Sequence, residues 1–118
     1  MTTAADEHSL ISRELLTKAE EAVGQDDLLQ ASEKGWGAAA HMVKGLAEKR
    51  GWQHSSHRVL YQAVNRLAQE SSDSELQVLF SVASALHSNF YENWMPKEMV
   101  EANLVQVRVL LEKLEELS

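Results

Sequence analysis

The feature that most constrains this chain is a helical pattern rich in small residues, which runs from Asp26 to Arg50. Gly35, Gly37 and Gly45 lie inside it, and each glycine within a helix costs about 0.5–1 kcal/mol relative to alanine. Close approach of another helix is the usual reason for a bare backbone at such positions. Because apolar side chains cover most of this helix and leave a narrow polar strip, we expect a central helix that other helices surround on most sides.

Composition predicts a single compact domain over residues 1–118. A chain of this length is expected to bury roughly two thirds of its unfolded surface, and 44% hydrophobic with 25% charged residues is ordinary for a globular domain. The chain has no cysteine, which excludes disulfides and thiolate metal sites and favours a reducing cytosol. No stretch approaches the roughly 18 apolar residues of a membrane span, and the polar, acidic N-terminus is unlike a signal peptide. We therefore expect a cytoplasmic protein without membrane contact.

Hydrophobic periodicity and helix-stop residues predict an all-α fold with five helices. Ser72 and Glu75 match a capping box ahead of the fourth helix, and Pro96 suits the first turn of the fifth. Short linkers favour antiparallel neighbours, which gives an up-and-down four-helix bundle with the third helix as an additional short element. The predicted helices, with their caps, cover about residues 9–23, 26–50, 56–69, 72–91 and 96 onward, and residues 1–8 are expected to be frayed.

Two segments together resemble a known family. One lies in the glycine-bearing helix and the other on the fourth helix, and the residues that carry the resemblance are Glu33, Trp36, Ala38, Ala39, Lys44, Leu86, His87, Asn89, Phe90, Tyr91 and Glu92. From about Gly24 onward the chain resembles the archaeal PaREP-type families, a branch of the HEPN-like helical bundles. The resemblance implies an up-and-down four-helix bundle that often pairs through its helices, and it implies no settled activity.

Many HEPN proteins are endoribonucleases, often toxins paired with a nucleotidyltransferase antitoxin, and the resemblance puts their catalytic histidine at His87. Their motif is an arginine followed, after four to six intervening residues, by that histidine. The corresponding positions here are Phe80, Ser81 and Val82. The missing arginine argues against ribonuclease activity, so the sequence favours a non-catalytic protein and leaves an enzyme as the alternative.

His87 has two physical interpretations. On a helical wheel it lies on the apolar side of the fourth helix, so it is either a buried neutral imidazole bonded within the bundle or a titrating group in a ligand pocket. The chain has no HxxxH or HxxE pair, and a closed zinc site needs ligands that converge, so we predict no metal and no cofactor. His41 falls in the polar strip of the second helix, where we expect it to be exposed to solvent.

Positive charge is concentrated between Lys44 and Arg66. This segment has five cations and one acid, a balance of +4, so the rest of a chain of net charge −7 carries −11. The excess is either an anion site for phosphate, nucleotide or RNA or ordinary charge at helix ends. Duplex nucleic acid is an unsuitable partner, because a chain this acidic lacks an extended basic surface. A phosphate-ligand or RNA-processing site would combine His87, Asn89, Tyr91, Arg50, His54 and Arg58.

The last predicted helix carries a second apolar stripe opposite its main seam, formed by Ala102, Val105 and Val109. Such a stripe favours a surface that pairs with another copy or holds a partner protein. We therefore expect a non-catalytic interaction or oligomerisation module, most simply a homodimer. The alternative is a phosphate-ligand or RNA-processing protein, of the HEPN ribonuclease or toxin–antitoxin type, that uses His87.

Overall fold

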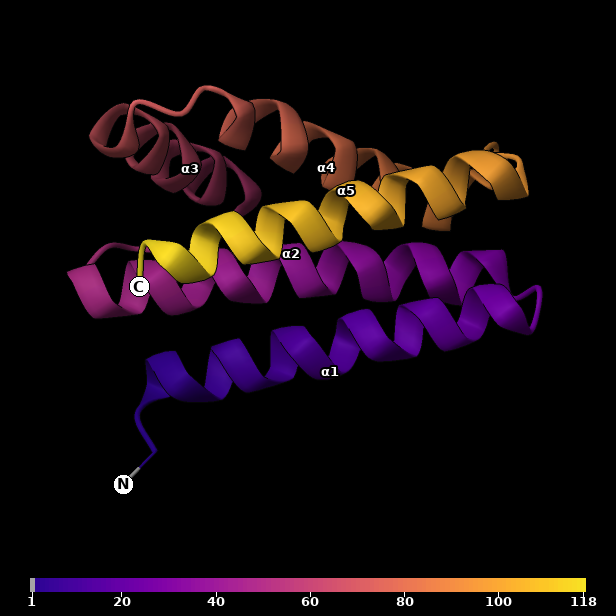
Figure 1. Ribbon diagram of the computed structural model, residues 1–118, viewed down its shortest axis with the longest axis horizontal. Coiled ribbons are helices and arrows are strands. Elements are labelled where there is room, and N and C mark those ends of the chain that lie inside the picture. The colour runs from indigo at the N-terminus through magenta and orange to yellow at the C-terminus, as the bar shows by residue number, and fades with distance from the viewer. Residues whose placement is uncertain (1) are drawn as a thin grey trace.

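The computed structural model describes residues 2–118, and the five regular elements in that range are all α-helices. The predicted all-α fold is therefore confirmed. None of these helices combines the length and the apolar character that crossing a bilayer requires. The helices are α1 (Ala4–Gly24), α2 (Leu28–Arg50), α3 (His57–Ser71), α4 (Glu75–Glu92) and α5 (Lys97–Glu116), and Figure 1 shows their arrangement.

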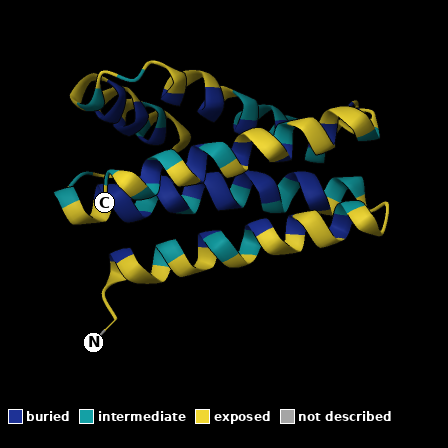
Figure 2. Cartoon of the chain, viewed as in Figure 1, coloured by how far each residue is buried: buried dark blue, intermediate teal, exposed yellow. Residues whose placement is uncertain are grey.

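The central helix of the fold is α2. It contacts each of the other four helices, and Figure 2 shows buried positions along most of its length between the two ends. A Cβ atom added at Gly35 would lie 2.6 Å from Leu104 of α5 and 3.0 Å from Leu86 of α4. One added at Gly45 would lie 3.1 Å from the carbonyl oxygen of Ala5 in α1. These glycines therefore mark close helix crossings, as the small-residue pattern predicts.

The four long helices alternate in direction. Ser12 of α1 donates a hydrogen bond to the carbonyl oxygen of Ala38 (2.5 Å), and the later residue Leu15 packs against the earlier residue Gly37 of α2. Figure 1 shows the same reversal between α2 and α4 and between α4 and α5. These four helices form the predicted up-and-down bundle, and α3 is the additional short helix.

One pair of consecutive helices departs from the antiparallel expectation. The α2 helix ends at Gly51, whose φ of 70° is left-handed and favours glycine, and the following loop runs back beside it. As a result His57 packs against Trp36, with ring centroids 5.2 Å apart, while the later residues Arg50 and Glu70 form an ion pair at 3.6 Å. An early residue of α2 thus contacts an early residue of α3, and a late residue contacts a late one. The two helices therefore run in the same direction.

The first helix begins earlier than predicted. The Thr3 hydroxyl accepts a hydrogen bond from the Asp6 N–H (3.1 Å), and the Asp6 carboxylate accepts one from the Thr3 N–H (3.2 Å). Ala5 is buried against α2. Residues 4–8, which we expected to be frayed, are helical because this capping box and the close crossing at α2 hold them. Met1, the first residue of the expected frayed end, lies outside the described residues.

The capping box predicted for α4 is wrong. Ser72 instead ends α3 in the left-handed conformation, with a φ of 54°. Ser74 occupies the N-cap position of α4 without a side-chain bond, and the Asp73 carboxylate accepts the Glu75 N–H at 3.1 Å. The turn between the helices is too short for Ser72 to cap both. Pro96 lies directly before α5 as its N-cap, rather than in its first turn.

Candidate functional site

His87 of α4 faces Glu33 of α2. Its Nδ1 atom lies 3.7 Å from Glu33 Oε2, which is too far for a hydrogen bond. Both atoms are buried, and neither has a hydrogen-bond partner among residues 2–118. The side chains as a whole border the surface, since 24% of His87 and 39% of Glu33 is exposed. An unpaired buried polar atom costs about 1–3 kcal/mol, so a small polar group bound between these two atoms would relieve that cost.

Three aromatic side chains surround the His87 ring. By centroid distance, Trp36 of α2 lies 5.2 Å away, His57 of α3 lies 4.9 Å away and Tyr91 of α4 lies 5.2 Å away. His57 and Tyr91 meet the imidazole edge to face, a favourable geometry for aromatic pairs. His57 reaches this place because the loop after α2 runs back along that helix. Tyr91 is 72% exposed and connects the cluster to the surface.

Asn89 has a structural role that the sequence interpretation missed. It is fully buried, and its amide nitrogen donates to the Ser32 hydroxyl at 2.8 Å. Its amide oxygen accepts from the N–H groups of Trp94 (2.8 Å) and Met95 (2.7 Å). These bonds join α4 to α2 and hold the turn that leads into α5. The Asn89 amide, which we expected in a ligand site, is therefore engaged by Ser32, Trp94 and Met95 in this fold.

The predicted cations do not gather around His87. Arg50 lies at the C-terminal end of α2, 17 residues from Glu33, which is about 25 Å along a helix axis. Arg58 is exposed in the first turn of α3, beside the His57 that contacts the imidazole. Of the predicted ligand residues, the structure therefore brings only Tyr91 directly against His87.

His54 belongs to a separate cluster with His8 and His41. The Nδ1 atoms of His8 and His41 lie 2.9 Å apart and share a hydrogen bond, the His54 ring lies 5.5 Å from His8 by centroid distance, and His54 Nε2 is 2.6 Å from Glu48 Oε2. Within residues 2–118, no group of three or more His, Asp and Glu side chains is arranged to hold a metal ion. The cluster therefore ties α1 and the loop after α2 to the C-terminal half of α2.

Burial lowers the pKa of both His8 and His41, and the nearby Lys44 ammonium lowers both further. His41, expected to be exposed, is instead half-buried. The reason is the early start of α1, whose first turns cover the polar strip of α2. A residue whose exposure depends on the length of a neighbouring helix is not predictable from its own helical wheel.

Glu33, Trp36 and His57 are the site residues that reasoning from single helices missed. Glu33 and Trp36 lie three positions apart on α2 and therefore share a face. Their proximity could have been predicted from the sequence. His57 carried no such signal, since only the return path of the loop after Gly51 brings it to His87.

The segments that form the Glu33–His87 pair both lie within residues 7–111, which match the model of the archaeal PaREP1/PaREP8 family. The chain belongs to this family. A crystal structure of a protein from Sulfolobus solfataricus shares the fold of this PaREP1/PaREP8 protein, with a TM-score of 0.75. The two chains are 24% identical, and the match covers 98% of this chain and 97% of the other. Comparison with curated proteins gives no match.

On the turns of α4 before His87, the histidine site of this PaREP1/PaREP8 protein has uncharged side chains at the positions of the HEPN arginine. Phe80, one of the positions where the HEPN motif has its arginine, is fully buried and packs against Trp36 at 5.4 Å. Ser81 is exposed and uses its hydroxyl to donate to the carbonyl oxygen of Gln77 at 3.0 Å. The turns of α4 before His87 thus supply packing and a helix-surface bond, not charge that would stabilise a phosphoryl transition state.

Proposed function

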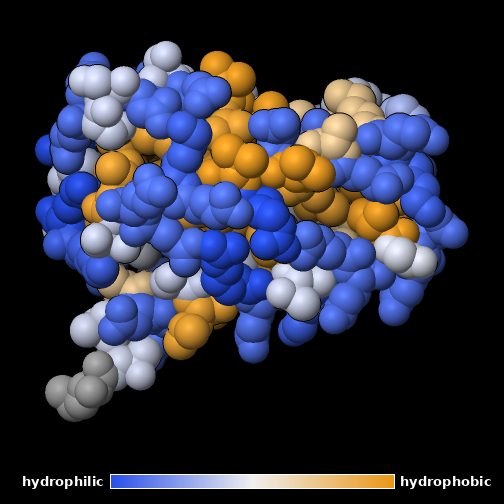
Figure 3. All heavy atoms as spheres, viewed as in Figure 1, coloured by the Kyte–Doolittle hydropathy of each residue, from blue (hydrophilic) through white to orange (hydrophobic). Residues whose placement is uncertain are grey.

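We propose that this protein is a non-catalytic, HEPN-like helical module that forms a homodimer through the outward face of α5. The observation that carries the proposal is the apolar stripe of Ala102, Val105 and Val109. Ala102 and Val105 are exposed, Val105 to 59%, and Val109 is half-buried beside them. Figure 3 shows apolar atoms gathered along α5 on the side toward the viewer. An apolar stripe about two helical turns long favours contact with another protein surface.

A second copy of the chain suits this stripe because its flanking charges are self-complementary. Glu101 and Arg108 lie on either side of Val105 along α5. If two α5 helices pair antiparallel about a two-fold axis near Val105, Glu101 of each copy meets Arg108 of the other. Opposite charges then lie at both ends of the apolar contact, which favours this register over a shifted one. Arg108 is already held at the surface by Glu20 of α1, at 2.7 Å.

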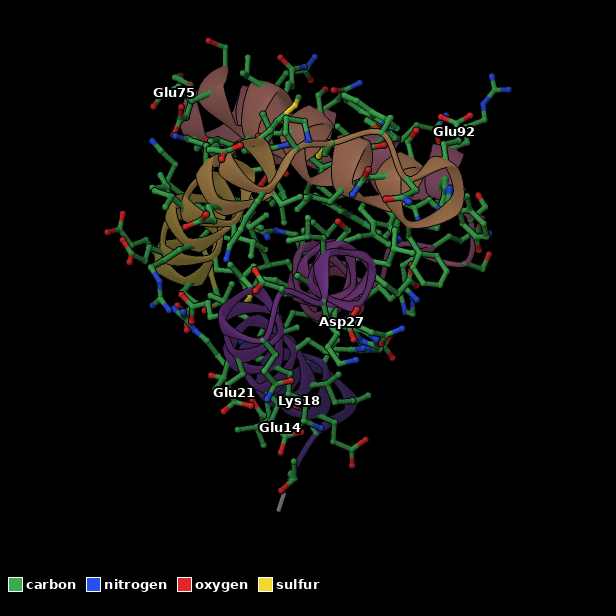
Figure 4. The ribbon with its side chains drawn as sticks, turned by 90° about the vertical axis from the view of Figure 1, so that its right-hand side faces the viewer. Glu14, Lys18, Glu21, Asp27, Glu75 and Glu92 are labelled. Carbon is green, nitrogen blue, oxygen red and sulfur yellow. The ribbon has the colours of Figure 1, made fainter. Side chains whose placement is uncertain are left out.

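The outer face of α1 is a poorer candidate for the interface. Figure 4 shows Glu14, Lys18 and Glu21 projecting from α1 on the side away from α2. Charged residues are depleted from interface centres because their desolvation is costly. Leu10 is 64% exposed on the same helix, but it borders this charged row. We therefore assign the interface to α5.

The alternative function is that of a phosphate-ligand or RNA-processing protein using His87. The observation that favours it is the unpaired Glu33–His87 pair at the edge of the surface. Chemistry on a phosphate needs a cation beside the histidine, whereas Arg50 lies at the far end of α2 and Asn89 is occupied by the protein itself. The interaction module is therefore the preferred proposal.

Sedimentation equilibrium over a dilution series tests the homodimer. A dimer that dissociates on dilution supports the proposal. A protein that stays monomeric up to its highest soluble concentration removes it, and only then does the histidine-based alternative become the working hypothesis.

A further inference from the structure

A small surface cavity, open to solvent, lies where the loop after α2 meets α3, and its lining does not include His87. Its volume is about 160 Å³. Its polar lining consists of Gln53 from the loop and of Gln62 and Arg66 from α3, and the Trp52 indole forms an apolar wall. No acidic residue lines it. The cavity lies inside the segment whose charge balance of +4 contrasts with the net −7 of the chain.

The Arg66 guanidinium, on an exposed side chain, lies over an aromatic ring. Its Cζ atom lies 4.0 Å from the centroid of the Trp52 ring, and the Arg50 Cζ atom lies 5.4 Å from the same centroid. Arg50 forms an ion pair with Glu70, whereas none of the ion pairs among residues 2–118 involves Arg66. A guanidinium stacked on a ring keeps its N–H donors free at its edge. Arg66 is therefore held by stacking while its donors remain available.

The amide side chains add donors from two further positions. Gln62 and Arg66 are four residues apart on α3 and so share a helix face, and Gln53 approaches from the loop. Arginine has five N–H donors and no acceptor, and each glutamine amide has two donors and one acceptor. The lining side chains thus carry more donors than acceptors, around a positive charge. Such a cavity is suited to a compact anion with several acceptor oxygens.

We propose that this cavity is an anion site for a phosphate group, bound by Arg66 together with Gln53 and Gln62 and walled by Trp52. The guanidinium edge binds two oxygens in its forked geometry, and the two amides reach the remaining oxygens from other directions. A carboxylate has only two oxygens in one plane and uses fewer of these donors. The cavity is smaller than the roughly 300 Å³ of ordinary small-molecule pockets, so it accommodates the phosphate group while the rest of a phosphate ester stays outside. This site is independent of the α5 dimer.

The test is a titration of the isotope-labelled full chain with sodium orthophosphate, at constant ionic strength, followed by nuclear magnetic resonance. We expect saturable shifts of the Trp52 indole N–H, the side-chain amides of Gln53 and Gln62, and the Arg66 Nε–H. The Trp94 indole and the Gln106 side-chain amide serve as internal controls and are expected to stay in place. Acetate at equal ionic strength is expected to leave all of these signals unshifted.

Two charge-matched variants separate the cavity from general electrostatics. Arg66→Gln removes the central donor and is expected to weaken phosphate binding about tenfold or more, as loss of a charged hydrogen bond does. Arg58→Gln removes the same charge from the same helix outside the cavity and is expected to change affinity by less than about twofold. Gln62→Leu, which keeps the charge, is expected to weaken binding as well.

Three outcomes overturn the proposal. The first is a lack of saturable shifts with orthophosphate. The second is equal weakening by Arg66→Gln and Arg58→Gln, which would mean that binding follows net charge. The third is acetate binding as tight as phosphate binding, which would remove the phosphate assignment.

Discussion

Glu33 Oε2 and His87 Nδ1 face each other 3.7 Å apart between α2 and α4, and both atoms are buried without a hydrogen-bond partner among the described residues. When Nδ1 carries no proton, two acceptors oppose each other. When it does, its N–H points at the carboxylate, and a small movement would close a hydrogen bond. The protonation of one atom therefore decides whether this contact stabilises or strains the crossing of the two helices.

Glu33→Gln distinguishes these states. If Nδ1 carries no hydrogen, a glutamine amide supplies the missing donor, and the free energy of unfolding rises by up to about 1 kcal/mol. Glu21→Gln on the exposed outer side of α1 is the matched control and is expected to change little. Urea unfolding monitored by circular dichroism measures both. A loss of stability in Glu33→Gln would instead show that Nδ1 carries a hydrogen and donates it to the carboxylate.

Gly35→Leu tests the close crossing of α2 with α4 and α5. A Cβ at this position would already lie 2.6 Å from Leu104 and 3.0 Å from Leu86, so the larger side chain forces the helices apart and costs about 1–3 kcal/mol or more. Gly24→Leu is the control, because a Cβ there meets nothing within 4 Å. Thermal melting compares the two variants. A Gly35→Leu protein that melts no lower than Gly24→Leu would show that the glycine is not required for packing.

The central position of α2 in the bundle was predictable, because its glycines and alanines allow other helices to approach closely. The start of α1 was equally readable in principle, since Thr3 and Asp6 form a capping box that lies before the hydrophobic pattern begins. The capping box at Ser72 was wrongly predicted because α3 ends and α4 begins within one short turn. A serine that terminates α3 cannot also cap α4.

The histidine site was only half predictable, for a physical reason. Placing His87 on the inward side of its helix needed only the helical period, whereas its neighbours depend on tertiary structure. The contact with His57 exists because the loop after Gly51 turns back, and the distance of Arg50 follows from the length of α2. Contacts between residues far apart in the chain produce no periodic pattern in a single sequence, so they could not be predicted from it.

Stability is expected to fall in mild acid because of the His8–His41 contact. Burial lowers the pKa of both side chains below the usual value of 6.5, so between that value and the lowered pKa the unfolded chain binds more protons than the folded one. Stability is therefore complete above about pH 6.5 and is lost as the pH falls through the folded-state pKa values. The charged and titratable groups that face the pair are Lys44, Glu48, Glu7 and His54.

Melting temperatures of the parent and of His41→Asn between about pH 7.5 and pH 5 measure this effect. The variant lacks one of the two half-buried imidazoles, so its melting temperature is expected to depend less steeply on pH than that of the parent. Parallel curves for the two proteins would exclude the pair as the source of the acid sensitivity.

Val105→Glu tests the proposed dimer surface. A carboxylate at the centre of the α5 stripe would be buried without a partner in the dimer, which is costly, so the variant is expected to be monomeric at concentrations where the parent is dimeric. Leu10→Glu makes the same kind of change on an exposed residue of α1 and is expected to leave the dimer intact. Light scattering after size-exclusion chromatography measures both masses. Equal loss of dimer in the two variants would move the interface away from α5.

Purified protein is expected to leave structured and single-stranded RNA intact. Cleavage would require a cation close to His87 to stabilise charge that develops on the phosphate, a contribution typically worth a few kcal/mol in the transition state. Phe80 and Ser81 do not supply it, and Arg50 is held at the other end of α2 by Glu70 and the Leu117 carbonyl oxygen. His87→Ala is therefore expected to lower the melting temperature, because the variant loses the contacts that the imidazole makes with neighbouring rings. RNA incubated with this variant is expected to stay intact as well. Gel electrophoresis of RNA incubated with the parent or with His87→Ala measures cleavage. Cleavage that persists through repurification and disappears in His87→Ala would establish a histidine-dependent ribonuclease and replace the proposed interaction module.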